Sequence, residues 1–164
     1  MTIRLEESTD WQAIYTVYAA AFGQSAEADL VRSMQNDGDL LLSLIAYNDQ
    51  PVGHIAYSHL RVIEAPSIKA CVLAPLAVAP AFRKQGIGAE LVRHSLEWLR
   101  SDSYDLVVVL GEPHYYGRFG FDPKLAEKLK TPYDGPYLQA LALSDGGRGA
   151  HGSVSYARAF AELN

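Results

Sequence analysis

A short basic segment with two glycines is the part of the sequence best suited to chemistry. Arg83 and Lys84 precede Gly86 and Gly88, and an apolar stretch ending at Val78 comes before them. Glycine lets the backbone approach a ligand closely, and backbone N–H groups at the start of a helix attract anions. The formal net charge of the chain is -5, so these cations reverse its sign locally. The segment predicts a phosphate site, although an ordinary tight turn would use the same glycines.

The spacing of these glycines excludes the two best-known nucleotide motifs. The dinucleotide fingerprint requires G-x-G-x-x-G and an acidic residue after the following strand, and this segment offers neither. The nucleoside-triphosphate loop requires Gly-Lys followed by Ser or Thr, which the sequence lacks. The remaining interpretation is a pyrophosphate cradle of another kind.

A second motif lies about thirty residues further along. It reads Tyr115-Tyr116-Gly117-Arg118-Phe119-Gly120-Phe121 and follows an apolar stretch. Together with the Arg83-x-x-Gly86-x-Gly88 spacing, it resembles the GCN5-related N-acetyltransferase (GNAT) superfamily. The run from Val109 to Phe121 is most similar to the small bacterial YhbS-type branch of that superfamily. The resemblance extends from the first expected strand to Phe121 and again from Tyr133 to Phe160.

The resemblance implies acetyl-CoA as cosubstrate and direct transfer of its acetyl group to an amine acceptor. Tyr116 matches the general acid that protonates the CoA thiolate as it leaves, with packing against the fifth strand as the structural alternative. Tyr115 matches a packing residue, and Phe119 and Phe121 match core residues. The residues implied in cofactor binding are Tyr116, the strand backbone at Leu76, Ala77 and Val78, and the loop amides of Arg83, Lys84, Gln85, Gly86, Ile87, Gly88 and Ala89.

The general base has several candidates. Many relatives place a glutamate on the fourth strand, but this sequence has no carboxylate between Ile68 and Val78. Glu112 is the candidate nearest the expected position, and capping of the following turn is its alternative role. Glu27 and His54 are further candidates, each with a surface or structural alternative, and a chain of water molecules could also serve.

Cysteine, histidine and charge content exclude several classes of protein. The single cysteine, Cys71, allows no internal disulfide and lies in an apolar strand, which predicts an inert thiol rather than an acyl carrier. The five histidines are scattered, so no metal site is expected. An acidic chain does not suit general nucleic-acid binding. The N-terminus resembles no signal peptide, and no apolar run approaches the roughly 18 residues that span a membrane, so a cytoplasmic location is expected.

The hydrophobic pattern predicts a single domain over residues 1–164 with one mixed, helix-covered sheet. The resemblance implies, more specifically, an α+β fold, which is a three-layer αβα sandwich with a largely antiparallel sheet of about seven strands. We expect strands over 3–6, 40–47, 52–62, 68–78, 106–110, 137–143 and 154–160. We expect helices over 9–22, with a Thr9 capping box, and over 25–36, 87–99 and 114–119, with a loop and short helix over 122–136.

Two rival functions remain open at this stage. A non-catalytic acyl-CoA sensor or regulatory protein would keep the same loop, and the missing carboxylate on the fourth strand favours it slightly. The acceptor could also be a protein N-terminus or lysine rather than a small molecule, since an acidic surface suits a cationic acceptor. The sequence leaves a homodimer open.

Overall fold

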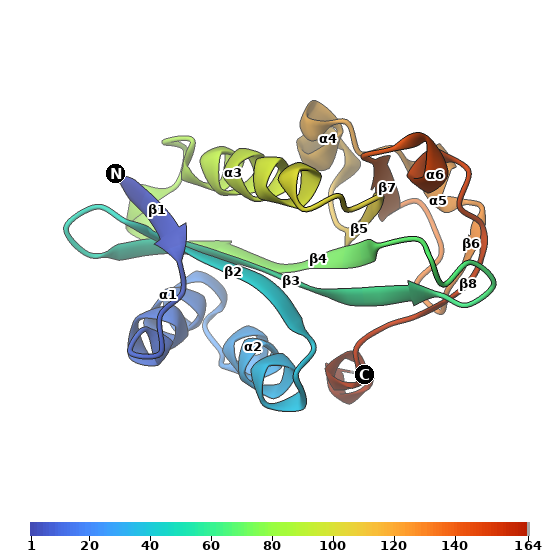
Figure 1. Cartoon of the computed structure of the whole chain (residues 1–164). Coiled ribbons are helices and arrows are strands. Elements are labelled where there is room, and N and C mark those ends of the chain that lie inside the picture. The colour runs from blue at the N-terminus through green and yellow to red at the C-terminus, as the bar shows by residue number, and fades with distance from the viewer. Residues whose placement is uncertain (164) are drawn as a thin grey trace. The chain divides into compact units, whose positions relative to one another are not determined.

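The computed structural model describes residues 1–163, which form two compact units (Figure 1). The first unit contains Met1–Tyr57, Pro75–Leu96 and the last segment from Arg158, and the second contains Ser58–Ala74 and Glu97–Ala157. Because the chain crosses between the units inside two strands and one helix, these three elements belong to both.

The strands form a mixed sheet in the order β1-β2-β3-β4-β5-β7, and β8 pairs with β3 and β6. β1 pairs antiparallel with β2, and β5 pairs parallel with β4 and antiparallel with β7. The expected mixed, largely antiparallel sheet is confirmed. The strands are β1 (Thr2–Leu5), β2 (Leu40–Tyr47), β3 (Pro51–Val62), β4 (Ala70–Val78), β5 (Leu106–Leu110), β6 (Leu129–Lys130), β7 (Leu138–Ala142) and β8 (Gly152–Ser155).

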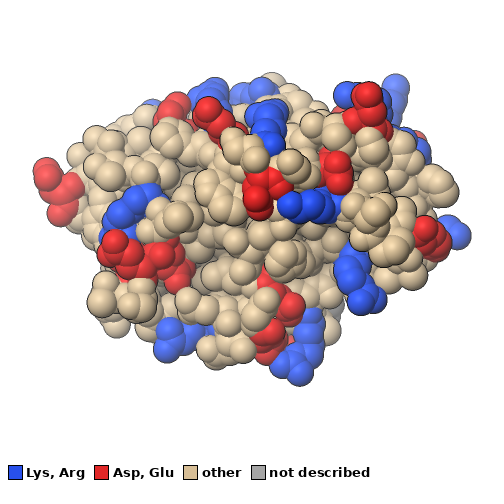
Figure 2. Space-filling view, in the orientation of Figure 1, with Lys and Arg blue, Asp and Glu red and all other residues tan. Residues whose placement is uncertain are grey.

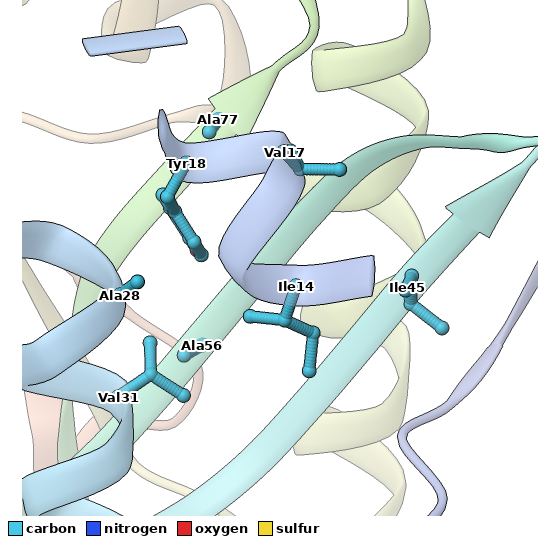
Figure 3. Close-up of a cluster of buried hydrophobic side chains, with 8 residues drawn as sticks. All are labelled: Ile14, Val17, Tyr18, Ala28, Val31, Ile45, Ala56 and Ala77. Atoms are coloured by element: carbon cyan, nitrogen blue, oxygen red, sulfur yellow. The ribbon is translucent and has the colours of Figure 1, made fainter. Parts of the chain in front are cut away.

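In the first unit, helices cover both faces of the strands (Figure 1). Helices α1 (Trp11–Phe22) and α2 (Ala26–Asp37) lie on one face, and α3 (Ile87–Ser101) lies on the other. On the α3 face, Gly53 of β3 leaves room for the helix, because a Cβ there would lie 3.0 Å from Leu91 Cδ1. The opposite core is made by Ile14, Val17, Tyr18, Ala28, Val31, Ile45, Ala56 and Ala77 (Figure 3).

In the second unit, β5 is the central strand. Its residues Leu106–Val109 are all at most 1% exposed, as expected for a strand with a partner on each side and cover on both faces. The chain then forms the short helix α4 (Pro113–Tyr116) and a 3₁₀ turn over Gly117–Phe119. Two further short helices follow, α5 (Pro123–Ala126) and α6 (Asp145–Arg148).

The expected start of the first helix was wrong in detail. No Thr9 capping box forms, and the residue before α1 is Asp10. The Asp10 carboxylate instead accepts hydrogen bonds from the Arg4 guanidinium and the Glu7 N–H, both at 2.7 Å. Arg4 holds the pKa of Asp10 down at about 2. An ion pair between β1 and the start of α1 therefore replaces the local cap.

The last expected strand also differs from expectation. On α1, Ile14, Val17 and Tyr18 are the buried residues, whereas Tyr15 and Phe22 are 37% and 46% exposed. The strand expected over 154–160 is β8 (Gly152–Ser155), followed by a 3₁₀ segment over Arg158–Leu163. β8 pairs with β3 and β6, and β6 itself was not expected.

The charged side chains on the face drawn in Figure 2 are interspersed, with Lys and Arg lying among Asp and Glu. Among residues 1–163, no helix is long and apolar enough to cross a membrane. The same residues contain no cluster of three or more His, Cys, Asp or Glu side chains that could hold a metal ion.

Candidate functional site

The segment between β4 and α3 has the geometry of an anion-binding loop. After a 3₁₀ turn over Pro80–Phe82, Lys84 and Gly86 adopt left-handed backbone angles, with φ of 64° and 81°. The carbonyl of Gly86 accepts the first helical hydrogen bond, from the Glu90 N–H at 3.0 Å. The N–H groups of the first turn of a helix have no acceptor within the helix, so those that follow Gly86 are available to a ligand.

The side chain of Arg83 is engaged elsewhere. Its Nη2 donates a hydrogen bond to the carbonyl of Ala21 at 3.0 Å, in the last turn of α1. This carbonyl lies at the helix end, where backbone acceptors lack helical donors. Arg83 therefore fastens the loop to α1, and the ligand-binding capacity of the loop rests mainly on its backbone.

The strand that leads into the loop loses its β5 partner before it ends. The parallel pairing of β4 with β5 runs from Ala70–Leu106 to Leu73–Val109. Pro75, two residues further along β4, has no N–H to donate to a neighbouring strand. Beyond it, Ala77 is buried in the core, whereas Leu76 and Val78 are only partly buried. The strand backbone expected to bind the cofactor thus lies on a stretch without a described β5 partner.

Tyr116 sits in an aromatic cluster of the second unit. Its ring lies 5.0 Å from that of Tyr115 and 5.8 Å from that of Phe121, both nearly perpendicular to it. Burial raises the pKa of the Tyr116 phenol to about 12, with a smaller contribution from Tyr115. Within residues 1–163 its hydroxyl makes no hydrogen bond. A protonated phenol with an uncommitted O–H can donate a proton to a ligand.

The position of the Tyr116 ring depends on two residues for which no functional role was expected from the sequence. Its ring packs directly over Gly111, where a Cβ would lie 2.5 Å from Tyr116 Cε2. Buried Gln139 of β7 donates from Nε2 to the Gly111 carbonyl at 3.1 Å. A glycine immediately after a buried strand was the available signal for Gly111, whereas Gln139 becomes relevant only through strand pairing.

The base candidates occupy different environments. Glu112 is exposed and caps α4, accepting a hydrogen bond from the His114 N–H at 3.4 Å. The Tyr116 N–H bonds to the Glu112 carbonyl at 3.0 Å, so these two residues share one helical turn. Glu27 accepts hydrogen bonds from Gln24 on the surface of the first unit. His54 is fully buried, which matches its structural alternative rather than an open base.

Cys71 is a buried thiol. It is 0% exposed, and its Sγ lies 3.9 Å from the Leu106 carbonyl. Burial raises the pKa of this thiol well above its usual range, so the nucleophilic thiolate is strongly disfavoured.

Comparison with known proteins gives consistent matches. A family model described as the acetyltransferase (GNAT) family matches residues 11–121. The chain is 35% identical over 161 residues to the N-acetyltransferase YhbS of Escherichia coli K12, covering 95% of this chain and 96% of YhbS. It is 39% identical over 142 residues to YjhQ of the same organism, covering 83% and 76% of the two chains.

Two solved structures resemble the fold closely. The structure of E. coli YhbS in complex with CoA matches with a TM-score of 0.91 and 33% identity, covering 99% of this chain and 93% of that one. A GNAT acetyltransferase from Brucella melitensis in complex with acetyl-CoA matches with a TM-score of 0.82 and 33% identity, covering 97% of each chain.

Proposed function

The chain belongs to the acetyltransferase (GNAT) family and is an acetyltransferase, and we propose that it moves the acetyl group of acetyl-CoA directly to an amine acceptor. The similar proteins from E. coli and B. melitensis bind CoA and acetyl-CoA respectively. The observation that carries the proposal is the loop after β4, whose left-handed Gly86 opens α3 with free backbone donors.

In this proposal, the loop amides from Arg83 to Ala89 hold the pyrophosphate of acetyl-CoA. The backbone of Leu76, Ala77 and Val78 pairs with the pantetheine arm, because β4 has run past its β5 partner there. Arg83 contributes by fixing the loop to α1 through Ala21. Lys84 is exposed and adds a screened positive charge to the loop.

The proposed reaction has two bond changes. The neutral amine nitrogen attacks the thioester carbonyl, forming a C–N bond and a tetrahedral intermediate with an oxyanion and a positively charged nitrogen. Collapse of this intermediate breaks the C–S bond, and the departing thiolate takes the proton of the Tyr116 phenol. The nitrogen loses its extra proton to water as the amide forms, and the phenolate regains a proton from solvent. A pKa of about 12 keeps Tyr116 protonated at neutral pH, as a general acid must be before it acts.

The proton lost by the acceptor ammonium goes to Glu112 or to a chain of water molecules. Glu112 supports this role by its exposure and by sharing a turn with Tyr116. The His114 N–H donates to Glu112 Oε1 and so orients this carboxylate at the start of α4. The acceptor is a small molecule or a protein or peptide amine, and a cytoplasmic location and a homodimer stay predictions of the sequence.

The decisive experiment measures acetyl-CoA turnover against a panel of amines for wild type and Tyr116→Phe. We expect the mutant to bind acetyl-CoA by calorimetry nearly as wild type does, but to lose about 10- to 100-fold in kcat. Tyr115→Phe removes a neighbouring hydroxyl from the same cluster and is the matched control. Unchanged kcat in Tyr116→Phe would remove the phenol from the acid role.

The rival function is a non-catalytic acyl-CoA sensor. It is favoured by the absence of a carboxylate along β4. The same experiment separates the two functions, because a sensor would bind acetyl-CoA tightly and transfer nothing to any small amine, peptide or tRNA. Absence of binding to acetyl-CoA by the folded wild type would contradict both.

A further inference from the structure

A chain of polar side chains runs through the core of the first unit. The Glu6 carboxylate bonds to the Ser43 hydroxyl, and Ser43 Oγ lies 2.7 Å from His54 Nε2. On the other side of the imidazole, His54 Nδ1 lies 2.7 Å from the Tyr18 hydroxyl. That hydroxyl is also 3.1 Å from the carbonyl oxygen of Pro75. His54 and Tyr18 are both 0% exposed, so neither exchanges these partners for water.

The two ends of this chain lie at different places in the unit. Glu6 and Ser43 line a surface pocket of about 230 Å³, where Gln35 of α2 donates to Glu6 Oε2 at 3.0 Å. The other end is the carbonyl of Pro75, just before the part of β4 that leads to the loop. The chain therefore connects a solvent-accessible carboxylate with the backbone of β4.

The number of protons does not match the number of contacts. Four contacts link Glu6 to Ser43, His54, Tyr18 and Pro75 in turn, and each needs one proton to be a hydrogen bond. Ser43, Tyr18 and a neutral His54 carry one proton each, and an ionised Glu6 carries none. The chain is therefore one proton short unless Glu6 or His54 takes up another.

The chemistry of the four groups determines which contact lacks a proton. Ionised Glu6 requires the Ser43 proton, so Ser43 must accept from His54 Nε2–H. His54 Nδ1 is then an acceptor of a hydrogen bond from Tyr18, which leaves the contact to Pro75, the longest of these four, without a proton. If Glu6 is protonated, every donor reverses and Tyr18 donates to Pro75. If His54 is protonated instead, both ring nitrogens donate and Tyr18 again bonds to Pro75.

The surrounding charges favour the proton-deficient form at neutral pH. Burial opposes ionisation of Glu6, but the nearby His54, whose Nε2 lies 3.7 Å from Glu6 Oε1, and the hydrogen bonds from Ser43 and Gln35 outweigh it and lower the Glu6 pKa. Burial also lowers the pKa of His54, against the opposing effect of Glu6. Asp10 also faces His54 from the start of α1, and its charge is balanced by Arg4 of β1.

We propose that Tyr18 is a positioning residue whose hydroxyl proton is directed by Glu6 through Ser43 and His54. When Glu6 is ionised, Tyr18 donates to His54. When the chain holds one more proton, Tyr18 donates to the carbonyl of Pro75 and fixes β4 there. This inference rests on the proposed function, because the β4 backbone after Pro75 is the part proposed to bind the pantetheine arm.

The first test is the tautomer of His54, read from its ring ¹⁵N chemical shifts in the full chain at neutral pH. We expect protonated Nε2 in wild type and protonated Nδ1 in Glu6→Gln. The amide oxygen introduced by Glu6→Gln can accept from Gln35 while its NH₂ donates to Ser43, which supplies the missing proton permanently. Glu7→Gln removes the neighbouring carboxylate, which takes no part in this chain of polar side chains, and should keep the wild-type tautomer.

Two results would overturn the proposal. One is an Nδ1–H tautomer in wild type at neutral pH, which needs no variant to be folded. The other is the same tautomer in wild type and in folded Glu6→Gln.

The second test is acetyl-CoA affinity, measured by calorimetry at one pH. Tyr18→Phe should weaken binding about two- to tenfold, the value of one hydrogen bond. Glu6→Gln should bind at least as tightly as wild type. Tyr15→Phe, from the exposed side of α1, is the matched control and should bind as wild type does.

The outcomes separate this inference from the proposed function. If wild type binds no acetyl-CoA, the proposed function fails, while the tautomer still decides whether Glu6 directs the Tyr18 proton. If wild type binds and folded Tyr18→Phe binds equally well, the positioning role of Tyr18 fails and the proposed function stands.

Discussion

The ring of Tyr116 lies directly against the α-carbon of Gly111, so closely that a Cβ at residue 111 would lie 2.5 Å from Cε2 and 2.9 Å from Cδ2 of the ring. Gly111 cannot easily retreat. Its N–H donates to the Tyr137 carbonyl at 2.9 Å, and its carbonyl accepts from Gln139 at 3.1 Å. Tyr137 and Gln139 thus hold the backbone against which the phenol packs.

We therefore expect Gly111→Ala to displace the Tyr116 phenol and lower kcat about 10- to 100-fold, because small errors in the position of a reacting group are costly. Binding of acetyl-CoA should change less. Steady-state kinetics and calorimetry would measure the two effects. Gly117→Ala, next to Tyr116, is the matched control because it has open space and a helical backbone with φ of -57°. Equal kcat values for the two alanine variants would contradict this account.

We expect Gly86→Ala to weaken acetyl-CoA binding about five- to tenfold. Its φ of 81° is strained for any L-residue by roughly 1–2 kcal/mol, so alanine would favour another loop conformation. Lys84→Ala should change affinity by less than about threefold, since exposed charges contribute little. Calorimetry with acetyl-CoA measures both.

Gly38 provides the control for backbone strain in this comparison. It has a similar φ of 77° and open space, but it ends α2. Gly38→Ala should lower the free energy of unfolding by about the same amount as Gly86→Ala and leave affinity unchanged. A larger loss of affinity in Lys84→Ala than in Gly86→Ala would show that side-chain charge, not backbone geometry, dominates the loop.

Helices and strands that are determined by residues close together in the sequence were predicted from the sequence. A helix over 87–99 and a strand over 106–110 were expected, and the structure has α3 at Ile87–Ser101 and β5 at Leu106–Leu110. The first two helices end close to the expected residues 22 and 36, where Gly23 and Gly38 adopt a left-handed conformation. The sequence could also locate Tyr116 and the loop, since each lies in a compact motif.

Features that depend on distant residues were missed. β6 has only two residues, Leu129 and Lys130, and exists because β8 pairs with it although β7 and α6 lie between them in the sequence. Thr9 is not at the N-cap, which is Asp10, and the Asp10 carboxylate binds Arg4 of β1 instead of capping α1. The roles of His54 and Gln139 arise from partners far away in sequence, which no spacing rule reveals.

The phenol of Tyr116 should stay protonated well above pH 10. Burial raises its pKa to about 12 in the folded chain, whereas an unfolded tyrosine titrates near 10. We therefore expect kcat to show no decline with an apparent pKa of about 10. A decline near pH 10 in wild type that Tyr116→Phe lacks would mean that the phenol titrates normally.

The raised pKa of Tyr116 also predicts a change in the stability of the fold with pH. Between about pH 10 and 12 the folded chain holds the Tyr116 proton and the unfolded chain has lost it, so the free energy of unfolding falls as pH rises. The slope from this group is at most about 1.4 kcal/mol per pH unit. Denaturant unfolding of wild type and Tyr116→Phe above pH 10 should show the smaller slope in the mutant.

Direct transfer predicts that Cys71 takes no part in the reaction. Its thiol is 0% exposed, and burial raises its pKa well above the usual range, so an acyl-thiol intermediate would need an ion formed inside the core. Cys71→Ala should keep kcat within about twofold and lose on the order of 1 kcal/mol of stability through a small cavity. Kinetics and denaturant unfolding would measure these changes.

The reactivity of the wild-type thiol gives an independent check. A thiol reagent should label Cys71 only as fast as the chain unfolds, because labelling requires an exposed thiolate. Mass spectrometry of wild type incubated with acetyl-CoA and no acceptor should find no acetyl group on Cys71. An acetylated Cys71 peptide that forms and decays at the rate of turnover would replace direct attack by a two-step mechanism, and Cys71→Ala would then be inactive although folded.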